Sequence, residues 1–134
     1  MAQRIEIYVD TGAFISLLDR SDSHHAVFRR LFSSPPALLT SALVISEGHG
    51  WFLRRYDQHR ALQFLQFISE VPTLTIRGFD SSELNAASPF LRKFADQKLT
   101  LADVHGLVLI RRESIRICWA TDRHLTLTGA TLVM

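Results

Sequence analysis

Cysteine is almost absent from this 134-residue sequence, in which Cys118 is the one thiol. No disulfide can form within the chain, which excludes the small disulfide-stapled folds and fits a reducing compartment. Cys118 lies in an apolar run between Ile117 and Trp119, and a thiol in such a run is typical of a hydrophobic core. We therefore expect no catalytic role for it.

Long apolar runs are also missing. No stretch approaches the ~18 residues of a membrane span, and the first residues lack the apolar segment of a secretory signal. We therefore expect a cytoplasmic protein with no membrane partner. Hydrophobic residues make up 47% and charged residues 21% of the chain, which is the composition of a globular protein. The length suits one hydrophobic core.

Several common catalytic and binding signatures are absent as well. The chain has no G-x-x-x-x-G-K-[ST] or G-x-G-x-x-G phosphate loop and no G-x-S-x-G nucleophile elbow, which sets aside those classes of enzyme. Lysine is scarce, since Arg provides 13 of the 15 basic residues. Arg suits phosphate and stacks on bases. Solvated helix faces are nevertheless the simpler explanation of the Arg doublets, and a net charge of +2 does not by itself indicate a nucleic-acid partner.

Strands are expected to alternate with helices along the chain. Apolar alternation and short apolar runs predict strands at residues 4–9, 37–40, 73–77, 115–120 and 130–133. Helical spacing predicts helices at residues 11–18, about 23–32, 41–56, 58–69, from 81 or 82 onward, 101–112 and 122–128. We expect Ser23 to cap the second helix and Pro89 to bend the fifth. This order predicts an α/β sandwich around a mainly parallel sheet.

Four acidic residues stand out by their positions in this order. Asp10 and Asp122 each follow a predicted strand, and ligands of open α/β sheets collect outside the carboxyl ends of the strands. Glu47 lies about two turns into the helix after the second strand, and Asp103 lies in the first turn of helix 101–112. If the strands are neighbours, all four acids reach the same edge of the sheet.

Helix capping competes with this interpretation for three of the acids. Asp10 and Asp122 are both suitable helix N-caps, and Thr100 with Asp103 matches a variant of the capping box. Glu47 lies inside an otherwise apolar helix, where capping does not explain it, although a solvated helix face stays open as its role.

A cluster of carboxylates would need a cation. Converging carboxylates raise one another's pKa unless a cation neutralises them, and oxygen ligands without a Cys or His spacing pattern favour Mg²⁺ or Mn²⁺ over Zn²⁺. Such an ion can activate a water and clamp a phosphodiester. Thr11 and Thr121 flank two of the acids and can hold a water or orient a carboxylate.

The order of four segments resembles PIN-domain proteins along nearly the whole chain, and the VapC branch of bacterial toxins in particular. The segments are VDTGAF, LTSALVISEG, KLTLADVHGLVLI and WATDRHLTLTGA. The resemblance implies that residues 1–134 form one PIN-like nuclease domain, a three-layer sandwich whose mainly parallel central sheet is flanked by helices. The site residues that it implies are an acidic catalytic and metal-binding quartet of Asp10, Glu47, Asp103 and Asp122, supported by Thr11, Thr121 and Asp96.

The same resemblance implies a function and partners. It points to a Mg²⁺-dependent endoribonuclease (Mn²⁺ is the second candidate ion) that is the toxin of a VapBC-type toxin–antitoxin pair. RNA, a VapB-like antitoxin that binds across the acidic pocket, and a second copy in a homodimer are the expected partners. Arg123, beside Asp122, is our candidate for contact with the RNA backbone. One departure is that Gly48 and Gly50 lie within a predicted helix, where they either permit close packing or loosen the segment that carries Glu47.

Two other functions fit part of the pattern. Strand-end aspartates around Mg²⁺ also serve receiver-like and phosphatase-like phospho-signalling domains. Those phosphatases usually carry a second Asp two residues after the first, where this chain has Gly12, and a receiver would pair its acids with a lysine near the last strand, whereas the lysines here are Lys93 and Lys98. The third candidate is a non-catalytic RNA-binding or interaction module on the same fold, against which the presence of all four acids argues.

The six histidines share no metal-ligand spacing, so we assign none of them to the metal. His49, His105 and His124 lie close in sequence to the proposed acids, and a supporting role beside those acids stays open for them. We expect Trp51 and Tyr56 to belong to the core or to a dimer surface rather than to stack on bases.

Overall fold

The computed structural model describes residues 4–133, in which helices and strands alternate as predicted. In chain order the elements are β1 (Ile7–Val9), α1 (Thr11–Leu18), α2 (His25–Leu31), β2 (Leu38–Ser41), α3 (Ala42–Arg55), α4 (Gln58–Glu70), β3 (Leu74–Arg77), α5 (Ser81–Lys93), the 3₁₀ helix η1 (Ala95–Gln97), α6 (Leu101–Arg112), β4 (Ile117–Trp119), the 3₁₀ helix η2 (His124–Thr128) and β5 (Thr131–Val133).

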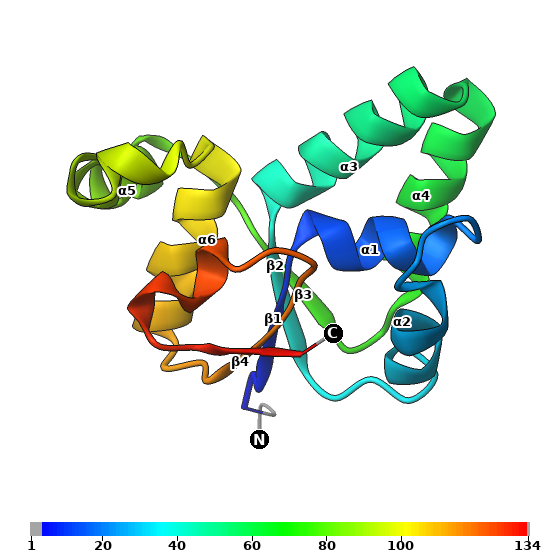
Figure 1. Cartoon of the computed structure of the whole chain (residues 1–134), viewed down its shortest axis with the longest axis horizontal. Helices are drawn as coiled ribbons and strands as arrows, with labels where there is room; N and C mark the ends of the chain where they lie inside the picture. Colours follow the sequence, from blue (N-terminus) through cyan, green and yellow to red (C-terminus); the bar gives the residue numbers. More distant parts are fainter. Residues whose placement is uncertain (1–3, 134) are drawn as a thin grey trace.

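The five strands form one sheet in the order β3-β2-β1-β4-β5, and every neighbouring pair is parallel. The predicted α/β fold with a parallel sheet is therefore confirmed. The chain starts in the middle of the sheet, builds toward the β3 edge, and then crosses to the β4 side. Parallel pairing brings the carboxyl ends of all five strands to one edge, where β1 leads into α1 and β2 leads into α3 (Figure 1).

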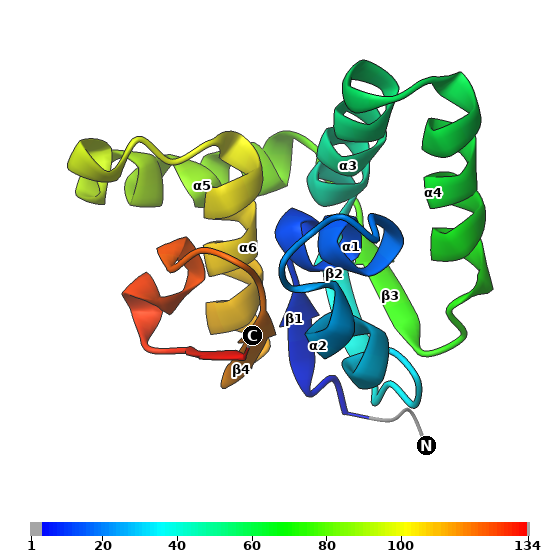
Figure 2. The same cartoon turned by 45° about the vertical axis from the view of Figure 1, so that its right-hand side comes forward.

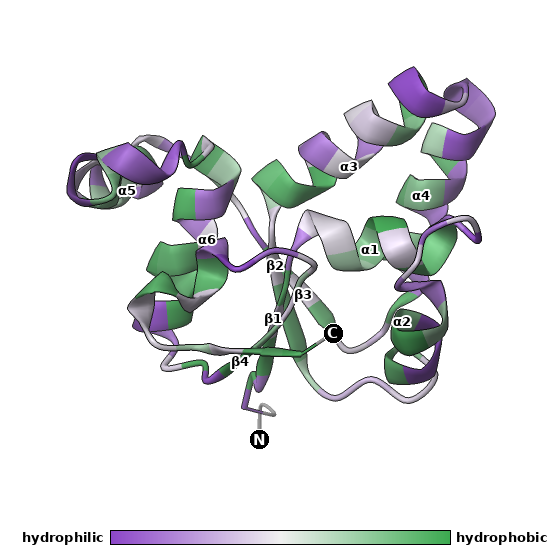
Figure 3. Ribbon diagram, viewed as in Figure 1, coloured by the Kyte–Doolittle hydropathy of each residue, from purple (hydrophilic) through white to green (hydrophobic). Residues whose placement is uncertain are grey.

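Alternation along the strands divides the core between the two faces of the sheet. On β1, Ile7 and Val9 pack into a cluster with side chains of α1 to α4, whereas Tyr8 packs into a second cluster with α6 and η2. The two views agree on the layers, with α1 to α4 on one side of the sheet and α5 and α6 on the other (Figures 1 and 2). The strands between them are mainly hydrophobic (Figure 3). This is the three-layer sandwich that the sequence predicts.

Some local predictions were wrong. Ser23 does not cap α2, whose N-cap is His24 without a side-chain cap hydrogen bond. Asp22 stabilises the turn before α2 instead, because its Oδ1 accepts a hydrogen bond from the backbone N–H of His24 at 2.8 Å. The 3₁₀ helix η1 was not predicted. None of the helices within residues 4–133 combines the length and hydrophobicity that crossing a bilayer requires.

The α3–α4 hairpin explains the first of the two helix glycines. Gly48 is buried where α3 meets α4, and a Cβ atom at this position would lie 2.5 Å from Cζ of Phe64. Any side chain here would push the two helices apart, which outweighs the ~1 kcal/mol of helix propensity that Gly forfeits relative to Ala. Close packing, and not a loosened helix, is therefore the role of Gly48.

Candidate active site

Beyond the carboxyl ends of the central strands lies a pocket of about 280 Å³ into which the predicted site residues converge. All four acids and both threonines of the sequence analysis line it. Its walls are Asp10, Thr11, Gly12, Ile15, Glu47, Trp51, Arg54, Asp103, Thr121 and Asp122.

Strand pairing explains why these side chains meet. β1 and β4 are parallel neighbours with Val9 opposite Trp119, and the backbone N–H of Asp10 donates to the Trp119 carbonyl oxygen at 2.9 Å. Asp10 and the Thr121–Asp122 segment therefore leave the sheet side by side. β2 lies on the other side of β1 and leads into α3, which brings Glu47 to the same edge.

Asp10 occupies the N-cap position of α1, but its side chain makes no cap hydrogen bond. The residue is 4% exposed. A buried carboxylate that does not cap its helix is left without the structural role that the sequence offered for it. Its position therefore calls for another explanation.

Asp103 and Asp122 do bond to the backbone. Asp103 completes a capping box, since its Oδ2 accepts the N–H of Thr100 at 2.9 Å while Oγ1 of Thr100 accepts the N–H of Asp103 at 3.1 Å. Asp122 Oδ1 accepts the N–H of His124 at 2.9 Å. His124 Nδ1 lies 3.3 Å from Asp122 Oδ1 and 3.7 Å from Asp103 Oδ2, between the two acids. These contacts orient both carboxylates and still leave them in the wall of the pocket.

Glu47 faces the pocket from α3 and is held there by a neighbour. The hydroxyl of Thr11 donates to Glu47 Oε1 at 2.7 Å and so links the first turn of α1 to α3. Glu47 is half-buried and lines the pocket, which excludes a fully solvated helix face as its position. Thr11 thus orients a carboxylate, one of the two roles that the sequence left open for it.

The electrostatics of the pocket are those of crowded acids. The pKa of Asp10 is raised from 3.8 to about 7, mainly by burial and also by the charges of Asp103, Asp122 and Glu47, while the backbone N–H of Thr11 acts in the opposite direction. Desolvation and like charge both disfavour the ionised carboxylate. A cation in this pocket would relieve both effects.

The donors suit a hard cation held partly through water. Among residues 4–133, no three acidic, histidine or cysteine side chains lie close enough together to hold one ion directly. The acids that line the pocket offer only oxygen donors, which fit Mg²⁺ or Mn²⁺, and Mg²⁺ in proteins usually keeps several of its waters. The residues present therefore fit a hydrated divalent ion.

Two residues of the sequence analysis do not share this pocket. Asp96 lies exposed on η1, where its Oδ2 accepts Nε2 of Gln97 at 3.4 Å, and Arg123 is exposed beside Asp122. Neither is among the residues that line the pocket. Their supporting and RNA-binding roles stay predictions.

The sequence analysis assigned Trp51 to the core or a dimer surface and did not single out Arg54. Both line the pocket, and Trp51 also packs against the core. The signal was present, because Trp51 and Arg54 follow Glu47 by four and seven residues on α3. Residues at these spacings share one face of a helix. Once Glu47 is placed in a site, the same face carries Trp51 and Arg54 with it.

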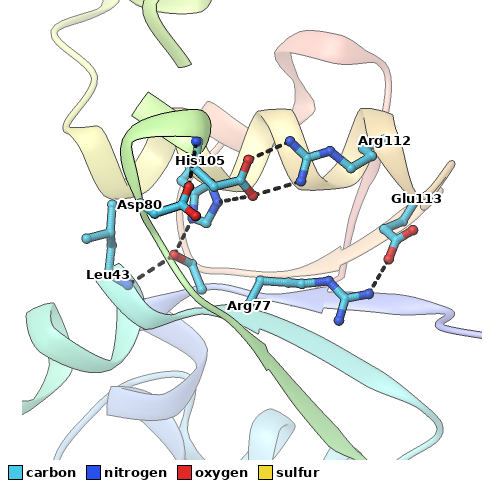
Figure 4. Close-up of polar contacts among 8 residues, drawn as sticks. Leu43, Arg77, Asp80, His105, Arg112 and Glu113 are labelled. Carbon is cyan, nitrogen blue, oxygen red and sulfur yellow. Dashed lines mark hydrogen bonds and ion pairs between the residues drawn. The ribbon is translucent and has the colours of Figure 1, made fainter. Parts of the chain in front are cut away.

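A polar network centred on a buried histidine connects the start of α3 with α5 and α6 (Figure 4). His105, fully buried on α6, pairs its Nδ1 with Oγ of Ser41 at 2.5 Å and its Nε2 with Oε1 of Glu83 at 3.2 Å. Glu83 receives two further bonds from Arg112, at 2.7 and 2.6 Å. Oγ of Ser41 also accepts the N–H of Leu43, which caps α3. The network ties the start of α3 to α5 and to α6, the helix that carries Asp103.

A larger hollow, of about 540 Å³, lies between the end of α1 and α4. Its walls include Leu18, Phe52, Phe64 and Phe67 together with Arg60. Volume alone would indicate this hollow as the active site. The converging carboxylates indicate the smaller pocket instead.

Comparison with known proteins gives the site a context. A family model described as the PIN domain matches residues 7–128. The 23S rRNA-specific endonuclease VapC20 of Mycobacterium tuberculosis is 25% identical over 125 residues, which are 92% of this chain and 94% of the relative.

Solved structures are similar over almost the whole chain. The crystal structure of Mycobacterium tuberculosis VapC20, described as a sarcin-ricin loop cleaving toxin, matches with a TM-score of 0.83 at 22% identity, covering 94% of this chain and 97% of that one. A toxin–antitoxin complex from Klebsiella pneumoniae matches with a TM-score of 0.63 at 15% identity, covering 96% and 97% of the two chains. These likenesses establish the shared fold.

Proposed function

The chain belongs to the PIN-domain family, a family of nucleases, and from this premise we infer that it is a VapC-type ribonuclease. We propose that it hydrolyses RNA phosphodiester bonds at the pocket formed by Asp10, Glu47, Asp103 and Asp122. The observation that carries the proposal is the convergence of these acids, from four separate parts of the chain, on one pocket at the carboxyl edge of the sheet. Asp10 is the central member, because it is buried and caps nothing.

PIN-domain nucleases generally use divalent metals, and for this chain we propose Mg²⁺, with Mn²⁺ as a close substitute. The ligands would be the four acids, directly or through water. A bound divalent ion supplies positive charge that activates a water and stabilises the transition state of phosphodiester hydrolysis. Thr11 fixes one oxygen of Glu47. The capping box likewise fixes Asp103, so that both carboxylates are oriented before substrate arrives.

The first test of the function is cleavage of an RNA pool that includes ribosomal RNA, because the curated relative is named as a 23S rRNA-specific endonuclease. We expect cleavage with Mg²⁺ or Mn²⁺ and none with EDTA. Asp10→Asn removes the charge of the buried acid and is expected to lower the rate about 10²–10⁴-fold, the range for loss of one catalytic group. Cleavage products resolved on a denaturing gel measure the rate.

Glu6→Gln is the matched control, because Glu6 is an exposed acid directly before β1 and outside the pocket wall, and its variant should cleave at the wild-type rate. Equal activity of wild type and Asp10→Asn would mean a contaminating nuclease or a site elsewhere. Metal-independent RNA binding without cleavage would favour the non-catalytic module. A phospho-signalling function has no support in the family, and the position that would hold its second Asp is Gly12 in the pocket wall.

For partners we propose a VapB-like antitoxin and a second copy of this chain. The similarity in fold to a chain of a toxin–antitoxin complex supports the first of these. An antitoxin that covers the acidic pocket would block the RNA from reaching it. Co-expression with the product of the neighbouring short reading frame tests this proposal, with co-purification and lost RNA cleavage as the expected result. Two proteins that separate fully on a sizing column would contradict it.

A further inference from the structure

Arg54 is a cation in the wall of a pocket that is otherwise acidic. It follows Glu47 by seven residues on α3, so the two side chains lie on one face of the helix about two turns apart. Both line the pocket, with Trp51 between them. Arg54 is exposed, whereas Asp10 at the base of the pocket is buried. Arg54 therefore lies on the exposed side of the pocket, as Asp122 does, whereas Asp10 lies further in.

Arg54 is not engaged within the protein. Over residues 4–133 it donates no hydrogen bond and forms no ion pair, whereas Arg60, Arg77 and Arg112 each bind an oxygen of the chain. Arg55, its neighbour, lies over the ring of Tyr56 at 5.6 Å from the centroid. An arginine in an acidic pocket wall would be expected to pair with one of the acids. Arg54 instead keeps its five donors available.

Gly50 leaves space beside the guanidinium of Arg54. A Cβ atom on Gly50 would lie 2.9 Å from Nη1 of Arg54, so the guanidinium folds back along α3 and over the bare backbone of Gly50. Long side chains in helices lean toward the N-terminus in this way. Gly in a helix interior lowers stability relative to Ala. The position of Arg54 gives a reason for the second glycine of α3.

We propose that Arg54 binds a phosphate of the RNA backbone at the rim of the acidic pocket. The assignment rests on the proposed ribonuclease function and adds a substrate-binding residue to it. The carboxylates repel the phosphodiester that must enter among them, and a free guanidinium at the rim offers a planar, bidentate contact of the opposite charge. Arg54 thus orients the RNA strand, while the acids carry the chemistry.

The test measures RNA binding separately from cleavage. A fluorescein-labelled RNA hairpin is titrated with the Asp10→Asn protein, which holds the RNA uncut, and fluorescence anisotropy gives the Kd. Introducing Arg54→Ala into this Asp10→Asn protein should raise the Kd about 10-fold or more. The slope of log Kd against log salt concentration should fall by the amount expected for the loss of one phosphate contact. Arg54→Lys should recover part of the affinity. Arg55→Ala, which removes the same charge one residue away, should bind like the parent.

Gly50→Ala separates this role from a folding defect. The added methyl group displaces the guanidinium of Arg54, so RNA affinity should fall while the melting temperature stays the same or rises. In the background that retains Asp10, Arg54→Ala should raise KM for RNA cleavage and leave kcat within about threefold.

Two results would overturn the assignment while the ribonuclease stands. In the first, wild type cleaves RNA, and Arg54→Ala binds and cleaves like Arg55→Ala. In the second, Arg54→Ala keeps its RNA affinity but no longer co-purifies with the antitoxin, which would mean that Arg54 binds the antitoxin and not RNA. If wild type neither binds nor cleaves RNA, the proposed function itself fails, and the role of Arg54 fails with it.

Discussion

Asp10→Asn is expected to stabilise the metal-free protein at pH 8, although the same substitution lowers the rate of RNA cleavage. The fold raises the pKa of Asp10 from 3.8 to about 7 through burial and the neighbouring carboxylates. At about 1.36 kcal/mol per pKa unit, holding this carboxylate ionised has a penalty on the order of 4 kcal/mol. The buried amide of Asn is itself partly desolvated, so we expect a gain of about 1–3 kcal/mol in the free energy of unfolding.

The pH dependence of this gain has a definite sign. Below the unfolded pKa of 3.8, Asp10 is protonated in both states and has no effect on stability. Between 3.8 and about 7 the unfolded state ionises first, so the wild-type protein loses stability as pH rises, and the loss levels off above about 7. The advantage of Asp10→Asn should therefore be small near pH 4 and complete by pH 8.

Urea unfolding in EDTA across this pH range measures the effect, with Asp96→Asn as the exposed control that should follow wild type. Added Mg²⁺ should stabilise wild type more than Asp10→Asn, since a ligand that binds only the folded state shifts the equilibrium by mass action. If the free energy of unfolding depended on pH in the same way for wild type and Asp10→Asn, the fold would not raise the pKa of Asp10. The carboxylate cluster would then not need a cation.

His105→Ala should lower the free energy of unfolding by about 3 kcal/mol, because the network that joins α3 to α5 and α6 loses its central side chain. The ring is fully buried and bonds to Ser41 on one side and Glu83 on the other. Its removal leaves a cavity and strips a partner from each of these groups. Arg112 holds the pKa of Glu83 down to about 2, with His105 adding to the effect, so Glu83 stays ionised at neutral pH and would lose one of its donors.

Urea unfolding at pH 7 tests this expectation. His59→Ala is the matched control, because His59 is exposed on α4 and should change stability by less than about 0.5 kcal/mol. Wild-type stability should also fall as pH drops from about 4.5 toward 2, where Glu83 takes up a proton. If His105→Ala unfolds like His59→Ala, the network of Figure 4 does not hold α3 and α6 together.

Local signals predicted the elements well where start and stop residues were present. Helix α6 begins and ends as expected, because Thr100 and Asp103 form a capping box and the apolar run stops at Arg111–Arg112. Ser41 likewise caps α3. The prediction failed at Ser23, since the sequence does not tell which of several adjacent polar residues closes the turn before α2.

The four acids were predictable for a similar reason. Asp10 and Asp122 end strands, and parallel strands deliver their carboxyl ends to one edge, so position along the chain was enough to group them. Whether the side chain of an acid caps a helix or makes no cap hydrogen bond was not predictable. Asp10 and Asp103 both looked like caps, yet Asp103 caps its helix and Asp10 does not. The difference depends on side-chain orientation within the packed pocket.

The sequence by itself determined the alternation of strands and helices, the buried faces and the set of acids at one sheet edge, because these follow from periodicity and from chain direction. Only the tertiary structure decided how residues distant along the chain meet. Ser41 and His105 are 64 residues apart, and Thr11 reaches Glu47 across 36. Arg54 lines the pocket with Asp10 and Asp122, which come from distant parts of the chain. Such contacts depend on packing in three dimensions, which no local pattern records.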